Sequence, residues 1–326
     1  MPMITRPTFW KLTLGIVALS VVALSVLRAD EPTYRRTEDV VYGRKFGSAL
    51  TLDVFQPKQG GNGLGIIAVL SGGWYSSKDG LDLGAMQFWT GRGYTVFAVV
   101  HGSQPKYAIP DAVRDMDRAV RFIRYHAKDY GVDPDRLGVT GSSAGGHLSL
   151  MLGTAGDLGD PNAPDPVNRM SSRVQAVACF YPPTDFLNYG KPGEPAIGEG
   201  TLKDFAAPFD FHELDPVRKR FERITDRARV EEIARSISPA NLATPDDAPT
   251  LILHGDADLL VPIQQSRLMV DRLKAAGVEA QLVTKPGADH GWPRMDLDLP
   301  ALADWFDAHL KAKASPASGQ PRAAAN

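Results

Sequence analysis

Only one cysteine, Cys179, occurs among the 326 residues, and the net charge is small. A lone cysteine cannot form an internal disulfide, so packing alone must stabilise the fold, even outside the cell. A formal charge of −2 at pH 7 gives no reason to expect nucleic acid or an anionic membrane as a partner. The remaining composition, 43% hydrophobic and 23% charged, is ordinary for a globular protein, and no internal repeat is evident.

A hydrophobic run long enough to cross a membrane is also missing near the N-terminus. The uncharged stretch Leu12 to Leu27 has 16 residues, whereas a spanning helix needs about 20. It follows Arg6 and Lys11, which is the layout of an export signal. We expect residues 1–29 to be a signal peptide cleaved after Ala29, and the working domain to be secreted or periplasmic. The alternative is an uncleaved anchor, and only then would the protein contact a membrane.

Short apolar segments alternate with segments of helical periodicity along most of the chain. The expected strands are residues 49–55, 65–70, 94–100, 137–140, 174–181, 250–254 and 278–284. The expected helices are residues 85–93, 110–130, 147–152, 264–276 and 299–310. This alternation predicts an α/β fold, with a mostly parallel central sheet of about eight strands and helices on both faces. The loops after the strands should cluster at one edge of that sheet.

The alternation is interrupted between residues 185 and 235. Residues 190–200 are rich in Gly and Pro, and residues 217–229 suggest charged helical pieces. Because this insertion stands between two buried strands, we expect a small cap over the strand tips. Residues 34–312 then form one domain that carries the cap. Ser, Pro, Gly and Ala dominate residues 313–326, which we expect to be a disordered tail.

The motif Gly-x-Ser-x-Gly occurs as Gly141-Ser142-Ser143-Ala144-Gly145, between an apolar strand and a helical run. In that context it predicts a nucleophile elbow, a turn so tight that the residues two positions either side of the serine must lack bulk. Ser143 would project its hydroxyl above a helix N-terminus, which favours negative charge. The simpler alternative is an ordinary Gly/Ser-rich turn, because matches this short also arise by chance.

A serine hydroxyl needs a base within hydrogen-bond reach, and the base needs a carboxylate to hold its tautomer. Of the seven histidines, His290 follows the last expected strand, where the base is needed. His212, in the loose insertion, stays open as an alternative. The other five are expected elsewhere: His126 and His309 on helix surfaces, His147 beneath the elbow, His101 too early in the chain, and His254 at a structural turn.

Two aspartates, Asp256 and Asp258, follow the strand that precedes the His290 loop. Asp258 is the expected carboxylate. Asp256 is its rival, although its position nearer the strand end suits a side chain that stabilises the turn. The resulting order along the chain, Ser143, Asp258 and His290, is nucleophile, acid and base.

Acyl transfer also needs N–H donors aimed at the oxyanion, each worth roughly 3–4 kcal/mol. The backbone N–H of Ala144, directly after the nucleophile, should be one of them. The other should come from Ser71-Gly-Gly-Trp74, which follows the strand at 65–70. Gly73 is the expected donor, and Gly72 or Trp74 could share the role. The alternative is that this stretch is only a turn.

Taken together, these motifs resemble the α/β-hydrolase superfamily. Within it, the chain is similar to the acetyl-xylan and feruloyl esterase-like group, which is related to the hormone-sensitive-lipase and prolyl-oligopeptidase-type serine hydrolases. The resemblance covers about Ala49 to His309 and rests on residues 49–57, 130–138, 141–147, 254–262 and 289–291. It implies an α/β-hydrolase fold with a Ser143–His290–Asp258 triad that acts on esters without a cofactor or metal.

Two stretches depart from the pattern of that group. Its His-Gly-Gly-Gly-Trp type of oxyanion loop is Leu70-Ser-Gly-Gly-Trp74 here, and its usual Tyr-Arg-Leu after the next strand is His101-Gly-Ser103. Both stretches would lie beside the pocket, so they concern the substrate more than the class of reaction.

We therefore expect an exported carboxylic ester hydrolase whose partners are small-molecule or polysaccharide esters. The resemblance implies acetyl or feruloyl groups on plant or algal polysaccharide. Trp74, Tyr75 and Trp292 could line a sugar or aromatic site. The alternatives are a serine peptidase of the prolyl-oligopeptidase type, or a non-catalytic binding protein on the same fold, which the altered pair Leu70-Ser71 would favour.

Overall fold

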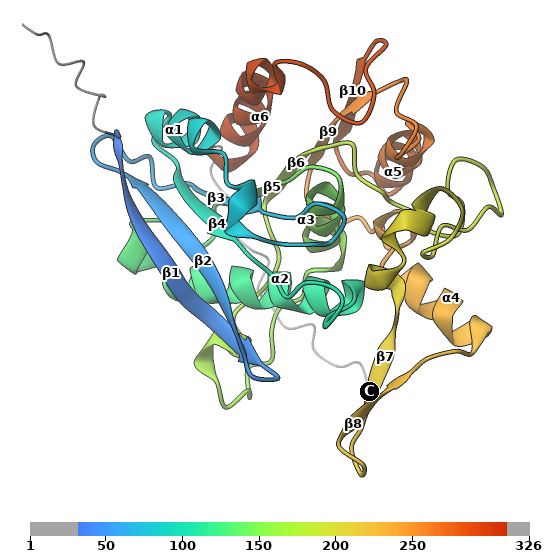
Figure 1. Ribbon diagram of the computed structural model, residues 1–326. Helices are drawn as coiled ribbons and strands as arrows, with labels where there is room; N and C mark the ends of the chain where they lie inside the picture. Colours follow the sequence, from blue (N-terminus) through green and yellow to red (C-terminus); the bar gives the residue numbers. More distant parts are fainter. Residues whose placement is uncertain (1–31, 312–326) are drawn as a thin grey trace, which may run out of the picture. The chain divides into compact units, whose positions relative to one another are not determined.

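One eight-stranded sheet organises the fold (Figure 1). The computed structural model describes residues 32–311. The strand order is β1-β2-β4-β3-β5-β6-β9-β10. The strands β1 (Tyr34–Lys45) and β2 (Ser48–Pro57) pair antiparallel, and β2 is also antiparallel to β4. All other neighbouring strands run parallel. The expected α/β-hydrolase fold with a mostly parallel sheet is therefore confirmed.

Continuous apolar sequence places the parallel strands in the middle of the molecule. They are β3 (Gly65–Val69), β4 (Thr95–Val99), β5 (Leu137–Thr140), β6 (Ala176–Phe180), β9 (Thr250–Gly255) and β10 (Ala280–Lys285). Every residue of the first five is buried, as expected for strands that are covered on both faces. Because parallel strands end at the same edge, the loops that follow them meet there.

Helices cover both faces of the sheet (Figure 1). The helices are α1 (Leu83–Gly91), α2 (Ile109–Tyr125), α3 (Ala144–Ala155), α4 (Arg227–Ser236), α5 (Gln264–Ala275) and α6 (Leu299–Lys311). One hydrophobic cluster contains Met116 of α2, Leu148 of α3 and Met269 of α5. The other contains Trp89 of α1 and Phe306 of α6. The two clusters are the two faces of the sheet, and they leave its carboxyl edge open to the loops.

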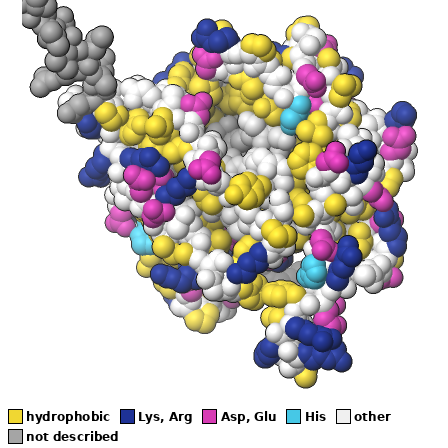
Figure 2. All heavy atoms as spheres, viewed as in Figure 1, with side chains coloured by type: hydrophobic (Ala, Val, Ile, Leu, Met, Phe, Trp, Pro, Cys, Tyr) yellow, Lys and Arg dark blue, Asp and Glu magenta, His cyan; other side chains and the backbone are white. Residues whose placement is uncertain are grey.

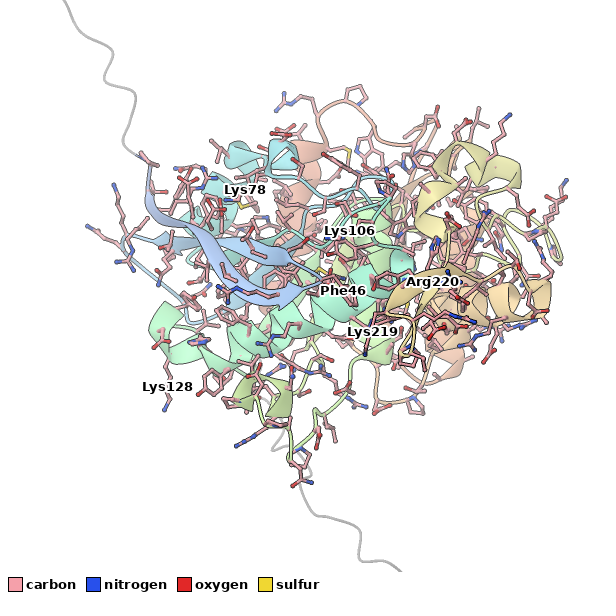
Figure 3. The ribbon with its side chains drawn as sticks, turned by 60° about the horizontal axis from the view of Figure 1, so that its bottom comes forward. Phe46, Lys78, Lys106, Lys128, Lys219 and Arg220 are labelled. Atoms are coloured by element: carbon pink, nitrogen blue, oxygen red, sulfur yellow. The ribbon has the colours of Figure 1, made fainter. Side chains whose placement is uncertain are left out.

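The insertion after β6 contains a projecting hairpin, β7 (His212–Asp215) and β8 (Arg220–Arg223), followed by α4. The prediction of helical pieces over residues 217–229 is thus wrong for the part before α4, where β8 lies. Asp215 accepts hydrogen bonds from the N–H groups of Val217 and Arg218, and Lys219 has a φ of 54°, so the chain turns instead of continuing as a helix. Figure 3 shows Lys219 and Arg220 close to Phe46, whose ring contacts that of Phe221 at 5.0 Å.

Some expectations lie outside the part of the chain that the structure describes. These are the signal peptide or anchor at residues 1–29 and the tail at residues 313–326. Within residues 32–311, none of the helices combines the length and the apolar character that crossing a membrane requires.

Candidate active site

Ser143 lies in a strained turn between β5 and α3. Its backbone has φ 54° and ψ −120°, a conformation that residues other than glycine rarely adopt. A Cβ on Gly141 would lie 2.5 Å from the carbonyl oxygen of Gly145, and a Cβ on Gly145 would lie 2.8 Å from the carbonyl oxygen of Val69. Glycine is therefore required at both positions, and the motif forms the elbow that its spacing predicts.

Three side chains from distant parts of the sequence meet at this turn. His290 Nε2 lies 2.9 Å from Ser143 Oγ, and His290 Nδ1 lies 2.8 Å from Asp258 Oδ2. Asp258 follows β9 and His290 follows β10, two neighbouring parallel strands. The Nδ1–H donates to the carboxylate, which leaves Nε2 free to accept the serine proton. This geometry can activate the serine hydroxyl as a nucleophile.

Asp258 is buried and held at both oxygens. Its Oδ1 accepts hydrogen bonds from the N–H groups of Leu260 and Val261, at 2.9 and 2.8 Å. Its Oδ2 also lies 3.3 Å from His254 Nε2. Burial would raise the pKa of Asp258, but the hydrogen bonds from His254, His290 and the Val261 N–H outweigh burial and hold this pKa well below its usual range. The carboxylate is therefore charged beside His290.

The rival aspartate has a different position. Asp256 Oδ1 accepts a hydrogen bond from the Gly287 N–H at 2.6 Å and so joins the two loops that follow β9 and β10. None of the hydrogen bonds of the described residues joins Asp256 to a histidine. The structure thus places Asp258, and not Asp256, next to the base.

None of the other histidines makes a hydrogen bond with Ser143 in the part of the chain that the structure describes. His212 is exposed on the hairpin and contacts the Asp210 carbonyl. His126 and His309 face Asp129 and Glu279 near the surface. The remaining three, His101, His147 and His254, are buried structural groups. Burial lowers the pKa of His101 and of His147 to about 4, so both are neutral at pH 7.

The expected oxyanion loop is a two-residue turn closed by Gly72 and Tyr75, which exchange two backbone hydrogen bonds of 2.9 Å. Gly73 and Trp74 at its tip have φ values of 54° and 57°. Gly72 was expected as a possible oxyanion donor, and this is wrong because its N–H donates to Tyr75. Among the hydrogen bonds of residues 32–311, none is donated by the Gly73 N–H. The Ala144 N–H, in the first turn of α3, has no partner within its own helix.

The aromatic residues that were expected to contact substrate have different positions. Trp74 is only 3% exposed: its indole N–H donates to His147 Nδ1 at 3.1 Å, and its ring packs against Phe186 and Phe209. The prediction that Trp74 lines the pocket is therefore wrong, because the ring points into the core beneath the turn. Tyr75 is 54% exposed and lines the pocket described next.

Trp292 lies beneath the His290 loop. Its indole N–H donates to Asp298 Oδ2 at 2.7 Å, and its ring contacts Phe180 and Tyr181. It does not line the pocket beside the elbow. The structure thus gives Trp292 packing contacts, and its role as a substrate contact stays a prediction.

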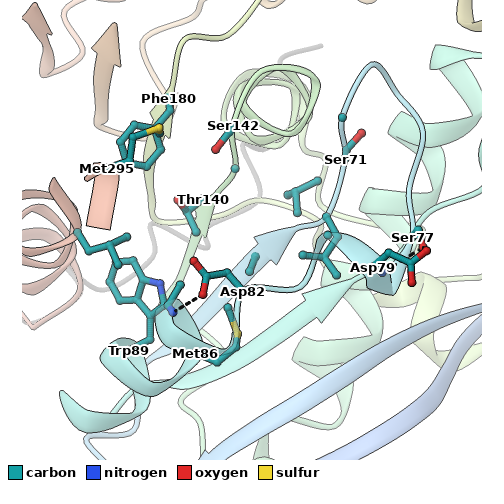
Figure 4. Close-up of a pocket in the computed structure, with 18 of the residues that line it drawn as sticks. Ser71, Ser77, Asp79, Asp82, Met86, Trp89, Thr140, Ser142, Phe180 and Met295 are labelled. Atoms are coloured by element: carbon teal, nitrogen blue, oxygen red, sulfur yellow. Dashed lines mark hydrogen bonds between the residues drawn. The ribbon is translucent and has the colours of Figure 1, made fainter. Parts of the chain in front are cut away.

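A pocket of about 630 Å³ opens beside the elbow (Figure 4). Gly141 and Ser142, which precede the nucleophile, and Ser71 and Gly72 of the oxyanion loop form one end. Apolar side chains form most of the remaining wall: Met86, Trp89, Phe180, Met295 and Leu299. Three carboxylates also line it: Asp79, Asp82 and Asp296. In Figure 2 the surface is hollowed between α1 and the β9–β10 end of the sheet, and hydrophobic and acidic side chains surround the hollow.

Two residues of the site had no signal in the sequence analysis. Tyr181, directly after β6, places its ring 4.5 Å from the imidazole of His290. Trp89 of α1 reaches the pocket from a helix in which no site residue was predicted. Neither belongs to a motif, and only the packing of distant elements brings them to the site. No group of three or more His, Cys, Asp or Glu side chains in residues 32–311 is placed to hold a metal ion.

Comparison with known proteins agrees with this geometry. Residues 52–273 match the protein family described as BD-FAE. The chain is 29% identical over 245 residues to the probable carboxylic ester hydrolase LipM of Mycobacterium tuberculosis, covering 74% of this chain and 52% of that protein. It is 27% identical over 289 residues to an ethyl acetate hydrolase of Pseudomonas putida, covering 84% and 80%. The chain spans about half the length of the first curated relatives that it matches.

Solved structures give the same picture. A truncated form of a carbohydrate esterase from gut microbiota superposes with a TM-score of 0.66 at 25% identity, covering 86% of this chain and 98% of that one. An acetyl ester-xyloside bifunctional hydrolase from Caldicellulosiruptor lactoaceticus shares the fold, with a TM-score of 0.63 at 24% identity and coverage of 84% and 94%.

Proposed function

The chain belongs to the BD-FAE family, and from the geometry of its site we propose that it is a carboxylic ester hydrolase. The observation that carries the proposal is the continuous line of hydrogen bonds from Ser143 through His290 to Asp258, at 2.9 and 2.8 Å. This line starts at a serine in a strained elbow, directly before Ala144. Among the hydrogen bonds of residues 32–311, none is donated by the backbone N–H of Ala144 or of Gly73. These are the parts that acyl transfer requires.

The reaction follows from the position of each group. Ser143 Oγ attacks the ester carbonyl while His290 Nε2 takes its proton, and Asp258 stabilises the imidazolium that forms. The N–H groups of Gly73 and Ala144 stabilise the negative charge that develops on the carbonyl oxygen. His290 then protonates the leaving alcohol, and water releases the acyl group by the same route.

For the substrate, we propose acetyl or feruloyl groups on a polysaccharide. The family and the esterase neighbours that act on carbohydrate support this choice. A largely apolar pocket of about 630 Å³ beside the nucleophile offers room for an acyl group larger than acetyl. The proposal also includes export, on the basis of Arg6, Lys11 and the apolar run Leu12 to Leu27. The intact mass of the exported protein tests the cleavage: cleavage after Ala29 removes residues 1–29, and an N-terminus at Met1 or Pro2 would rule it out.

Covalent labelling by a fluorophosphonate tests the enzyme. We expect labelling and turnover of 4-nitrophenyl acetate by the wild type, and loss of both in Ser143→Ala. Ser142→Ala is the matched control, because it changes the neighbouring serine and leaves the nucleophile in place. A wild type that is not labelled would indicate a binding protein that retains the fold.

A second comparison separates esterase from peptidase. We expect 4-nitrophenyl acetate to be cleaved much faster than an aminoacyl anilide. A preference for the anilide would overturn the esterase proposal in favour of a peptidase on the same triad.

A further inference from the structure

The two stretches that depart from the family's sequence pattern contact each other. Ser71 follows β3 and His101 follows β4, which are neighbouring parallel strands, so their carboxyl ends lie side by side. Ser71 Oγ lies 2.8 Å from His101 Nε2. The altered oxyanion loop is thus hydrogen-bonded to the altered loop of the next strand.

The tautomer of His101 determines the direction of this hydrogen bond. His101 Nδ1 lies 2.8 Å from the carbonyl oxygen of Gly102, which can only accept, so Nδ1 carries the proton. Burial lowers the pKa of His101 to about 4, so the ring is neutral and Nε2 has a free lone pair. Ser71 must therefore donate its single hydroxyl proton to Nε2.

The backbone holds Ser71 in the same place. Its carbonyl oxygen accepts a hydrogen bond of 3.2 Å from the Gly145 N–H, in the first turn of the helix below the nucleophile. Its side chain lines the pocket, and Figure 4 shows it with Ser142 at one end and Trp89 at the other. Within residues 32–311, no hydrogen bond is donated to Ser71 Oγ. The oxygen therefore presents lone pairs, and no proton, to the pocket.

We propose that Ser71 is a specificity-determining residue whose hydroxyl oxygen accepts a hydrogen bond from a hydroxyl group of the ester substrate. An ordinary serine can donate or accept, and so it does not distinguish a hydroxyl from an ether or a carbonyl. Ser71 can only accept a hydrogen bond from the substrate, because it donates its single hydroxyl proton to His101 Nε2. It therefore favours esters that carry a free hydroxyl over matched esters that lack one. This inference rests on the proposed ester hydrolysis.

Two pairs of esters test the proposal and locate the hydroxyl. Methyl 4-hydroxycinnamate and methyl cinnamate differ on the acyl side, and 2-hydroxyethyl acetate and propyl acetate differ on the alcohol side. For each pair we measure the ratio of kcat/KM, hydroxylated over unhydroxylated, in the wild type and in Ser71→Ala. Differences in intrinsic reactivity cancel when the two ratios are compared. Loss of one neutral hydrogen bond should lower the ratio about threefold to tenfold in one of the pairs.

Two further variants separate this role from a general disturbance of the site. Ser77→Ala alters a serine at the rim of the same pocket, whose hydroxyl donates to Asp79 at 2.8 Å, and should keep the wild-type ratios. His101→Phe keeps a buried ring but frees the Ser71 proton, so Ser71 can then donate as well as accept. The ratio should lie between those of the wild type and Ser71→Ala. The double variant should have the ratio of Ser71→Ala, because His101 affects the ratio only through the Ser71 hydroxyl. If His101→Phe does not fold, Ser71→Ala still decides.

The outcomes distinguish this inference from the proposed function. Unchanged ratios in both pairs for Ser71→Ala overturn the role of Ser71 and leave the esterase proposal intact. If the wild type turns over none of the four esters, the role of Ser71 is overturned as well. Fluorophosphonate labelling of Ser143 decides the proposed function independently.

Discussion

The ring of Tyr181 lies against the imidazole of His290, with 4.5 Å between the ring centroids. Tyr181 directly follows β6 and has a φ of 34°, a strained value for a residue other than glycine. Its hydroxyl lies 3.6 Å from Met295 Sδ, so both ends of the ring are in contact. The ring of Tyr181, a residue with a strained backbone, thus limits the positions that the His290 imidazole can take.

Replacement of Tyr181 by leucine should lower kcat about tenfold with a smaller change in KM, because a ring contact of this kind is worth about 0.5–1.5 kcal/mol. Without the ring, the imidazole can leave the line between Ser143 and Asp258. Tyr181→Phe keeps the ring and should lose less than about threefold. Steady-state kinetics on 4-nitrophenyl acetate measure both. Equal losses in the two variants would contradict a role of the ring in positioning His290.

Replacement of Asp258 by asparagine should lower kcat on the order of 10³–10⁴-fold, because the imidazolium loses its charged partner and the histidine can adopt the other tautomer. Asp256→Asn is the matched control, since Asp256 lies two residues away and contacts the Gly287 N–H instead. It should retain most of the activity. A larger loss in Asp256→Asn than in Asp258→Asn would reverse the assignment of the acid.

Gly73→Ala should lower kcat by about 10²-fold, which is typical for the loss of one oxyanion donor. The new Cβ would lie 2.6 Å from the ring of Phe205, and the φ of 54° strains any other residue. The turn must therefore shift, and the Gly73 N–H shifts with it. Gly72→Ala is the control, because a Cβ there has no neighbour within 4 Å. Its effect on kcat should be much smaller, and similar losses in both variants would argue against Gly73 as the donor.

The buried His147 should make the protein less stable in mild acid. It accepts from the Trp74 indole N–H and faces the Ile237 carbonyl, and burial lowers its pKa from 6.5 to about 4. In this range the unfolded chain binds more protons than the folded one, so stability falls as the pH drops from about 6.5 towards 4. Between pH 7 and pH 5 the loss from this group should be about 2 kcal/mol.

Urea unfolding of the wild type and His147→Gln at pH 7 and pH 5 measures this contribution. The variant should be less stable than the wild type at pH 7 but should lose less stability on acidification. The same pH dependence in both proteins would show that His147 does not cause it.

Much of the fold and of the catalytic centre could be predicted from local sequence. The buried strands are continuous apolar runs, and the elbow is a motif whose glycines are required by contacts of 2.5 to 2.8 Å. Asp258 and His290 follow from their places after successive parallel strands. The strand β1 was missed because most of its residues are partly or fully exposed, so no alternation marks it.

What the sequence by itself determined is the set of reacting groups, because a tight turn and the end of a buried strand depend on neighbouring residues. The tertiary structure alone decided the surroundings of those groups. It turned Trp74 inward onto His147, 73 residues away, and joined Ser71 to His101, 30 residues away. It also placed Tyr181 on His290. Such contacts depend on which elements lie side by side in space, and the spacing of residues along the chain does not predict which elements those are.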